Sequence, residues 1–142
     1  MQVEQKNVKF LIDGERRIYG QLFLYEESPD DEDMVLLEAE LMGKEFKFKS
    51  ESFFSALIAL RRELEKEGIQ ILCNGSARKV YPSRMQLSMG SGRLAYILTM
   101  GQQAKSSDMV DIFDYDDEFE FVAINKQVIY YNEWLNSIIL QK

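Results

Sequence analysis

Residues 7–25 are Asn7-Val8-Lys9-Phe10-Leu11-Ile12-Asp13-Gly14-Glu15-Arg16-Arg17-Ile18-Tyr19-Gly20-Gln21-Leu22-Phe23-Leu24-Tyr25. Two arms rich in β-branched and aromatic side chains, residues 7–13 and 16–25, flank Asp13-Gly14, a pair typical of tight hairpin turns. Gly20 interrupts the second arm and marks a candidate β-bulge. The stretch therefore predicts an antiparallel hairpin, and the rest of the fold is worked out around it.

A second hairpin is predicted from residues 33–41 and 44–49, which flank Met42-Gly43. Residues 44–49, Lys44-Glu45-Phe46-Lys47-Phe48-Lys49, alternate almost perfectly between charged and aromatic side chains. Such alternation is expected of a strand with one face in water. The two hairpins together predict four antiparallel strands.

The clearest helix signal covers residues 51–67. Ser50 or Ser52 can cap its N-terminus, and Gly68 can end it. Its apolar stripe at helical spacing consists of Phe53, Leu57, Leu60 and Leu64. The far end, residues 61–67, is predicted to be solvated, and the helix is predicted to cover the sheet.

Shorter elements follow. Residues 69–73 predict a buried strand, and residues 93–100, 109–113 and 119–124 are further strand candidates. Residues 125–140 predict a second helix because Val128, Tyr131, Leu135 and Ile138 keep helical spacing, with Trp134 beside that stripe. Residues 128–131 are four consecutive β-formers, so a strand is the competing interpretation there.

The predicted fold class is α+β. A mainly antiparallel sheet of about five to seven strands is packed by two helices, at about 51–67 and 125–140, in one domain spanning residues 1–142. No apolar stretch is long enough for a transmembrane helix, and no secretory signal is expected. The single cysteine, Cys73, cannot form an internal disulfide, which fits a reducing cytoplasm, and a buried, inert thiol is expected.

Histidine is absent from the chain. This excludes histidine-dependent triads and, with only one cysteine, a structural zinc site. Catalysis by carboxylate, lysine or tyrosine stays open, but we expect a protein that is not an enzyme and needs no cofactor or metal.

Charge is distributed unevenly along the sequence. Residues 68–107 contain no acidic residue and five basic ones, although the whole chain carries −7 from 24 acidic and 17 basic residues. Half of the acids lie in two runs, six in residues 26–33 and six in residues 111–120. Neither run has the spacing of an EF-hand calcium loop, and the net negative charge argues against nucleic-acid binding.

Either acidic run is a solvated loop or a surface that docks on a basic protein. Aromatic side chains interleave with the second run, which suits a docking surface because charges steer the encounter and rings anchor it. The candidate partner-binding residues are Asp111, Asp114, Tyr115, Asp116, Asp117, Glu118 and Phe119, with Asp30, Asp31 and Glu32 from the first run.

The acid-free block is the alternative site. Its small and guanidinium-bearing residues at 74–93 could hold a phosphate or carboxylate, although no P-loop or dinucleotide fingerprint is present. The competing interpretation is a long connection whose arginines pair with the acidic loops of the same molecule. The candidate anion-binding residues are Arg78, Tyr81, Ser83, Arg84, Ser91 and Arg93.

Several short segments carry a resemblance that covers about residues 68–114. They are residues 71–76 (Ile-Leu-Cys-Asn-Gly-Ser), 80–83 (Val-Tyr-Pro-Ser) with Met85, 90–92 (Gly-Ser-Gly) with Ala95-Tyr96, and 110–114 (Val-Asp-Ile-Phe-Asp). This pattern resembles small bacterial cytoplasmic proteins that look like immunity proteins of contact-dependent or polymorphic toxin systems. The position after Ser83 is often glycine in that pattern and is Arg84 here, which argues against a tight turn or a ligand cradle at that point.

The leading hypothesis is a cytoplasmic immunity-type protein that neutralises a basic, nuclease-like toxin by occluding it. The alternative is a small anion- or nucleotide-binding domain centred on residues 74–93. A third interpretation is a structural subunit whose acid-free block pairs with an acidic face of a second copy, giving a homodimer. No membrane partner is expected.

Overall fold

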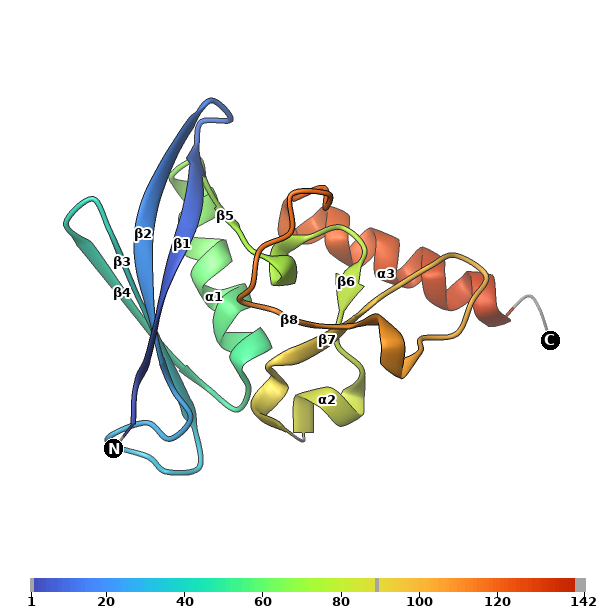
Figure 1. The fold of residues 1–142 in the computed structure, drawn as a ribbon, viewed down its shortest axis with the longest axis horizontal. Coiled ribbons are helices and arrows are strands. Elements are labelled where there is room, and N and C mark those ends of the chain that lie inside the picture. The colour runs from blue at the N-terminus through green and yellow to red at the C-terminus, as the bar shows by residue number, and fades with distance from the viewer. Residues whose placement is uncertain (1, 89, 140–142) are drawn as a thin grey trace.

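The computed structural model describes residues 2–88 and 90–139, and it confirms an α+β fold (Figure 1). A five-stranded antiparallel sheet and a three-stranded sheet are combined with three α-helices. The strands are β1 (Glu4–Ile12), β2 (Arg16–Tyr25), β3 (Val35–Leu41), β4 (Lys44–Ser50), β5 (Ile69–Leu72), β6 (Val80–Tyr81), β7 (Leu94–Ile97) and β8 (Met109–Asp111). The helices are α1 (Phe53–Lys66), α2 (Arg84–Ser88) and α3 (Ile124–Ile139), with 3-10 turns η1 (Asn74–Ser76), η2 (Gly90–Gly92) and η3 (Ser106–Asp108).

Both predicted hairpins are confirmed. The larger sheet has the order β4-β3-β2-β1-β5, with every neighbouring pair antiparallel. The turn residues Asp13-Gly14 and Met42-Gly43 all have positive φ, the conformation that matches a tight turn to the twist of its strands. The first connection has three residues, 13–15, and the second has two.

Gly20 does not mark a bulge, so that prediction was wrong. β2 pairs with β1 in unbroken register, with Gly20 opposite Val8. A Cβ at Gly20 would lie 2.6 Å from a ring carbon of Phe10 and 2.5 Å from the carbonyl oxygen of Glu40. The glycine therefore makes room for the buried Phe10 ring inside a regular strand.

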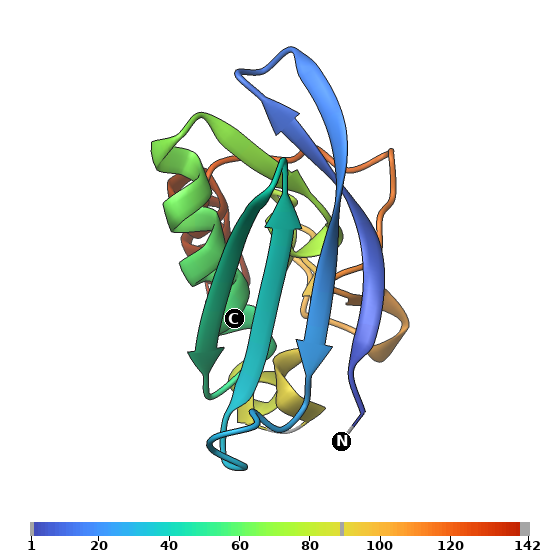
Figure 2. The same ribbon diagram turned by 90° about the vertical axis from the view of Figure 1, so that its left-hand side faces the viewer.

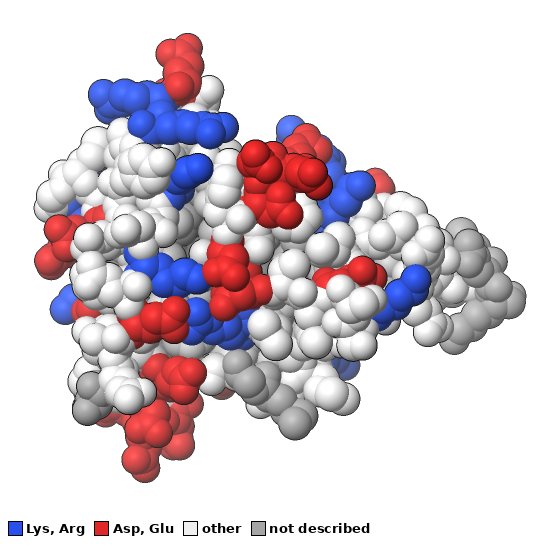
Figure 3. All heavy atoms as spheres, viewed as in Figure 1, with Lys and Arg blue, Asp and Glu red and all other residues white. Residues whose placement is uncertain are grey.

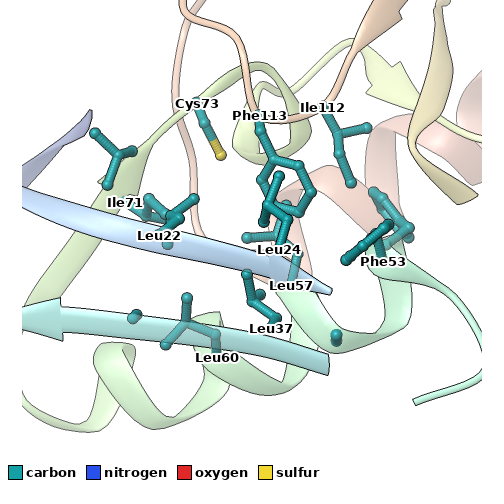
Figure 4. Packing of buried hydrophobic residues seen from close by; sticks show 14 of the residues in the cluster. Leu22, Leu24, Leu37, Phe53, Leu57, Leu60, Ile71, Cys73, Ile112 and Phe113 are labelled. Carbon is teal, nitrogen blue, oxygen red and sulfur yellow. The ribbon is translucent and has the colours of Figure 1, made fainter. Parts of the chain in front are cut away.

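Helix α1 packs against one face of the larger sheet and supplies much of the core (Figure 4). Ser52 caps it by accepting a hydrogen bond from Ser55 N at 3.1 Å, and Gly68 follows its C-terminus with φ +72°. The predicted stripe Phe53, Leu57, Leu60 and Leu64 is fully buried. Phe113, from the segment after β8, meets Phe53 edge to face at 5.6 Å between ring centroids.

Arg61 corrects the prediction of a solvated far end of α1. Its side chain is buried and donates hydrogen bonds to Gly75 O, Val122 O and Gln127 Oε1. Gln127 is also buried, and its amide donates to the carbonyl oxygens of Gly75, Ala77 and Val80. This polar cluster joins α1 to α3 and to the chain between β5 and β6.

The smaller sheet has the order β6-β7-β8 and lies beside α3 (Figure 1). Its strands are shorter than the predicted segments at 93–100 and 109–113. Residues 119–124 do not form a strand: Phe121 makes only an isolated bridge to Ala77. The reason is that the backbone of this segment bonds to the η1 region, through Arg78 N to Glu120 O and Val122 N to Ser76 O.

Residues 128–131 are helical, as part of α3. The buried face of α3 is centred on Gln127 and Trp134, one position away from the predicted stripe of Val128 and Leu135. Tyr131 is part of the predicted stripe and also of the observed packed face, because its ring stacks on that of Tyr81, with 4.2 Å between the ring centroids. Leu140, the end of the predicted helix, lies outside the described residues.

Helix α2 was not predicted. Ser83 Oγ accepts a hydrogen bond from Gln86 N at 3.1 Å, and Gln86 Oε1 accepts one from Ser83 N at 2.9 Å. This reciprocal pair is a capping box, which starts the short helix.

Within residues 2–88 and 90–139, we find no helix with both the length and the apolar character required to cross a membrane.

Candidate functional site

In the described part of the chain, one face of the five-stranded sheet is covered only at its β1–β5 side, where Leu72 is buried and the ring of Tyr115 lies over Lys9. Figure 2 looks onto this face, with α1 and α3 behind the sheet and projecting past its β4 edge, and with α2 behind its lower end. Alternation along β2 directs Ile18, Leu22 and Leu24 toward α1, so the intervening side chains point outward. With the pairing registers, the outward set is Gln5, Asn7, Lys9, Leu11, Arg17, Tyr19, Gln21, Phe23, Tyr25, Leu36, Glu38, Glu40, Glu45, Lys47, Lys49, Gln70 and Leu72. We call this set the outer face.

Aromatic side chains form a row along β2 on the outer face. Tyr19 is 73% exposed, and Phe23 and Tyr25 are half-buried. Two adjoining hollows of about 250 and 470 Å³ share Glu38 and Lys47 in their linings, and they include Phe23 and Tyr25 respectively. Rings that are exposed on a rigid strand can be buried by a partner at little conformational cost.

Glu38 organises the charges of the outer face. Its carboxylate lies 3.2 Å from Lys47 Nζ. A hydrogen bond to the same carboxylate raises the pKa of the Tyr25 hydroxyl, and the pKa of Lys47 is raised for the same reason. The row of rings therefore ends in a fixed Tyr25–Glu38–Lys47 arrangement.

The first acidic run, residues 26–33, leaves β2 directly after Tyr25. Ser28 is buried and donates to Asp30 at 2.6 Å, and Lys49 also contacts Asp30 at 3.2 Å. These two partners lower the pKa of Asp30, Ser28 most strongly. Asp31 accepts a hydrogen bond from Asp33 N, and Glu32 is exposed. The loop is thus an ordered acidic rim at one end of the outer face.

The second acidic run is used largely within the molecule. Asp111 binds Arg93 at 3.0 Å and caps Phe113 N, and Asp114 forms an ion pair with Lys6. Glu120, the last acid of the run, binds Arg78 through both carboxylate oxygens.

The remaining candidates of the second run differ in exposure. Tyr115 stacks on Phe121, lies 4.0 Å from Lys9 Nζ and is 36% exposed, whereas Phe119 packs against the core. Asp116 accepts a hydrogen bond from Glu118 N, and both residues are exposed, as is Asp117.

Two of the three arginines of the acid-free block, Arg78 and Arg93, have separate carboxylate partners. Arg93 binds Glu4 through two hydrogen bonds of 2.7 and 2.8 Å, in addition to Asp111, and its pKa is raised chiefly by Glu4. Arg78 binds Glu120, and Arg84 is exposed at the start of α2. The structure therefore shows the pairing of arginines with the acidic segments that the sequence had left open.

The other three candidates of that block have local roles. Tyr81 packs between Phe54 and Tyr131, Ser83 caps α2, and Ser91 has a left-handed φ of +62°. A hollow of about 330 Å³ includes Arg93, but its other lining residues are Gln2, Glu4, Leu24, Glu26 and Glu27. None of the other five candidates lines that hollow.

In space the charges are mixed. Figure 3 shows Lys and Arg alternating with Asp and Glu across one side of the molecule, with an acidic group at the end where the β2–β3 loop lies. The +5 block of the sequence thus forms no separate basic surface on this side, and two of its arginines, Arg78 and Arg93, lie against acids from outside the block.

The described residues offer neither a reactive thiol nor a metal-binding cluster. Cys73 is fully buried, and burial raises the pKa of its thiol to about 11, so it is protonated at neutral pH. In the part of the chain that the structure describes, no group of three or more cysteine, aspartate or glutamate residues is arranged to hold a metal ion.

The aromatic row of the outer face is what the sequence reasoning missed. From the sequence, Phe23 and Tyr25 are interpreted only as strand-forming bulk, and Tyr19 carries no separate prediction. The three rings are separated by two or four positions, so they share one face of the strand, and Leu22 and Leu24 lie on the other face. This alternation is the signal that could have placed the rings on a face of their own. A scan against protein-family models found no family that matches this chain, and a search of curated proteins found no match.

Proposed function

We propose that this chain is an immunity-type binding protein that acts in the cytoplasm and neutralises a basic, nuclease-like toxin by covering its active site. The observation that carries the proposal is the continuity of the outer face with an acidic rim: the ring row of β2, exposed at Tyr19 and half-buried at Phe23 and Tyr25, runs directly into residues 26–33. A nuclease active site binds a polyanion and is therefore basic, so a rigid acidic rim complements it.

The two parts of the surface have different physical roles. Exposed carboxylates of the rim accelerate association by long-range attraction, roughly ten- to a thousandfold at low salt. The rings of Tyr19, Phe23 and Tyr25 would then lose water and hold the partner in place. Of the two acidic runs, the first is favoured, because Asp111, Asp114 and Glu120 of the second already bind cations of the same chain.

The alternative, a small anion- or nucleotide-binding domain at residues 74–93, has weaker support. Arg78 and Arg93 would have to release Glu120, Glu4 and Asp111 before binding an external anion. Only Arg84, among these three arginines, is free of a carboxylate partner in the described part of the chain.

The proposal is tested by expressing the product of the neighbouring gene alone and together with this protein. We expect the neighbour to arrest growth when expressed alone, growth to resume on co-expression, and the two proteins to elute as one complex in gel filtration. A neighbour that is folded, harmless and never co-elutes would contradict the proposal. Measuring nuclease activity of the purified neighbour with and without this protein distinguishes occlusion from indirect rescue.

A further inference from the structure

Strand β4 forms an unpaired edge of the larger sheet. All seven of its residues pair with β3 on one side only, in the register Val35–Ser50 to Leu41–Lys44. In a two-residue hairpin the residues that flank the turn exchange backbone hydrogen bonds, and the pattern then alternates along the strand. The N–H and C=O groups of Glu45, Lys47 and Lys49 therefore point to the free edge.

Lysines on an edge strand usually keep other strands away. Here each of them has a carboxylate partner in the same chain: Lys44 binds Glu67, Lys47 binds Glu38, and Lys49 binds Asp30. Their charges are therefore offset. Glu45, by contrast, has no ion-pair partner among the described residues and lies directly opposite Glu40, an unfavourable like-charge pair.

The apolar side of the same edge is incompletely covered. Phe46 and Phe48 pack against the core but stay half-buried, whereas Leu37 and Ala39, their neighbours on β3, are buried. An edge with free backbone groups, an unbalanced carboxylate and two half-buried rings calls for a partner strand.

We propose that the partner is a second copy of this chain, paired antiparallel through β4 about a two-fold axis at Lys47. This register pairs Glu45 with Lys49 of the second copy, twice, by symmetry, and each Lys49 then lies between Asp30 of its own copy and Glu45 of the other. It also places Phe46 beside Phe48 of the second copy on the inner side, an aromatic cross-strand contact. Each Lys47 keeps its ion pair with Glu38 of the same copy, so the charges of the two lysines that meet at the axis remain offset.

The resulting dimer has one continuous ten-stranded sheet. The pairing uses the edge of the sheet and leaves the ring row of β2 on the outer face uncovered in both copies. The dimer does not depend on the proposed toxin partner, so the dimer proposal and the toxin-binding proposal can each be contradicted without affecting the other.

The test is the molar mass of the isolated protein in solution, by light scattering over a dilution series. We expect a dimer that dissociates on dilution. Glu45→Lys or Lys49→Glu alone should weaken it by about a hundredfold, because each change creates two like-charge contacts per interface. The double variant Glu45→Lys with Lys49→Glu should restore the dimer.

Lys47→Pro provides an independent variant. Proline removes a backbone N–H from the free edge and not from the β3–β4 pairing, so the protein should fold and be monomeric, with circular dichroism as the check on folding. A wild-type protein that is monomeric at every concentration would overturn the inference. A dimer unaffected by Lys47→Pro would overturn it too, since another surface would then be responsible.

Discussion

The guanidinium of Arg61 donates a hydrogen bond to the side-chain oxygen of Gln127, 66 positions later in the chain, with both side chains buried. Arg61 has no carboxylate among its hydrogen-bond partners, all of which are neutral oxygens. Burial accordingly lowers the pKa of Arg61. Gln127 accepts from this cation and donates to three carbonyl groups, so one neutral side chain provides partners for four polar groups that water cannot reach.

Replacing Gln127 by Ala should therefore lower the free energy of unfolding by about 2–4 kcal/mol, since it leaves buried carbonyls and part of a guanidinium without partners. Urea unfolding followed by circular dichroism measures this. Gln127→Glu should also destabilise, because a carboxylate placed against three carbonyl oxygens cannot donate to them.

Asn132, exposed on the same helix, supplies the matched control for that experiment. Asn132→Ala should change the stability by no more than about 0.5 kcal/mol. Equal stability of the Gln127→Ala and Asn132→Ala variants would show that the cluster does not join the two parts of the fold.

The Cys73 thiol should resist alkylation in the folded protein at about pH 8, because it is buried and its pKa is raised to about 11. The thiol should react only through unfolding, with a rate that rises in urea. Mass spectrometry after timed exposure to iodoacetamide checks this, and rapid labelling without denaturant would contradict it.

The same thiol predicts a pH dependence of stability. Its folded pKa lies above the ordinary value of 9.0, so above about pH 9 the unfolded state loses this proton more readily than the folded state does. The stability that the protonated Cys73 thiol gives to the folded state is fully present below pH 9 and is lost as the pH rises toward 11. Unfolding curves of the wild type and Cys73→Ala should therefore converge in stability as the pH rises through this range.

Arg93 should contribute stability that disappears in acid. Its hydrogen bonds hold the pKa of Glu4 below the ordinary value of 4.5, so the stabilisation is present above that pH and is lost as the pH falls through the folded value. Arg93→Gln should cost about 1 kcal/mol near neutral pH, a small value because Glu4 is half exposed. The difference from the wild type should shrink on acidification.

Arg84→Gln is the control for Arg93, because its guanidinium is exposed and belongs to the same acid-free block. Thermal unfolding of both variants across the acidic range provides the measurement. If the two variants behave alike, the Arg93 ion pairs add nothing to the fold.

Binding kinetics with an identified partner should distinguish the role of the acidic rim from that of the aromatic rings of the outer face. Neutralising Glu26, Glu27, Glu32 and Asp33 should slow association in a salt-dependent way, since exposed charges are screened within about 8 Å at physiological ionic strength. Tyr19→Ala should instead speed dissociation and cost about 2 kcal/mol or more if Tyr19 is a central anchor.

Asp117 and Glu118 of the second run supply the comparison in that experiment. Changing them to Asn and Gln should affect association less than the changes in residues 26–33. Equal losses from both acidic runs, with no effect of Tyr19→Ala, would mean that net charge alone drives binding and that the outer face is not the interface.

Local chemistry made the larger sheet and α1 predictable. Turn residues with positive φ at Asp13-Gly14 and Met42-Gly43, the Ser52 cap and the stripe from Phe53 to Leu64 all act within a few residues. The segment from 119 to 124 was different, because its β-formers are used to bond the η1 region and to lead into α3. Propensity alone could not foresee those partners.

Two hairpins, the first helix, the inert cysteine and the absence of histidine chemistry were predictable, since each follows from neighbouring residues or from composition. Tertiary structure alone decided that Arg93 meets Glu4 across 89 positions, that Arg61 is buried, and that the acid-free block forms no basic patch on the side seen in Figure 3. The physical reason is that charge pairing and desolvation depend on distances in space, which the chain sets only when its distant segments pack together.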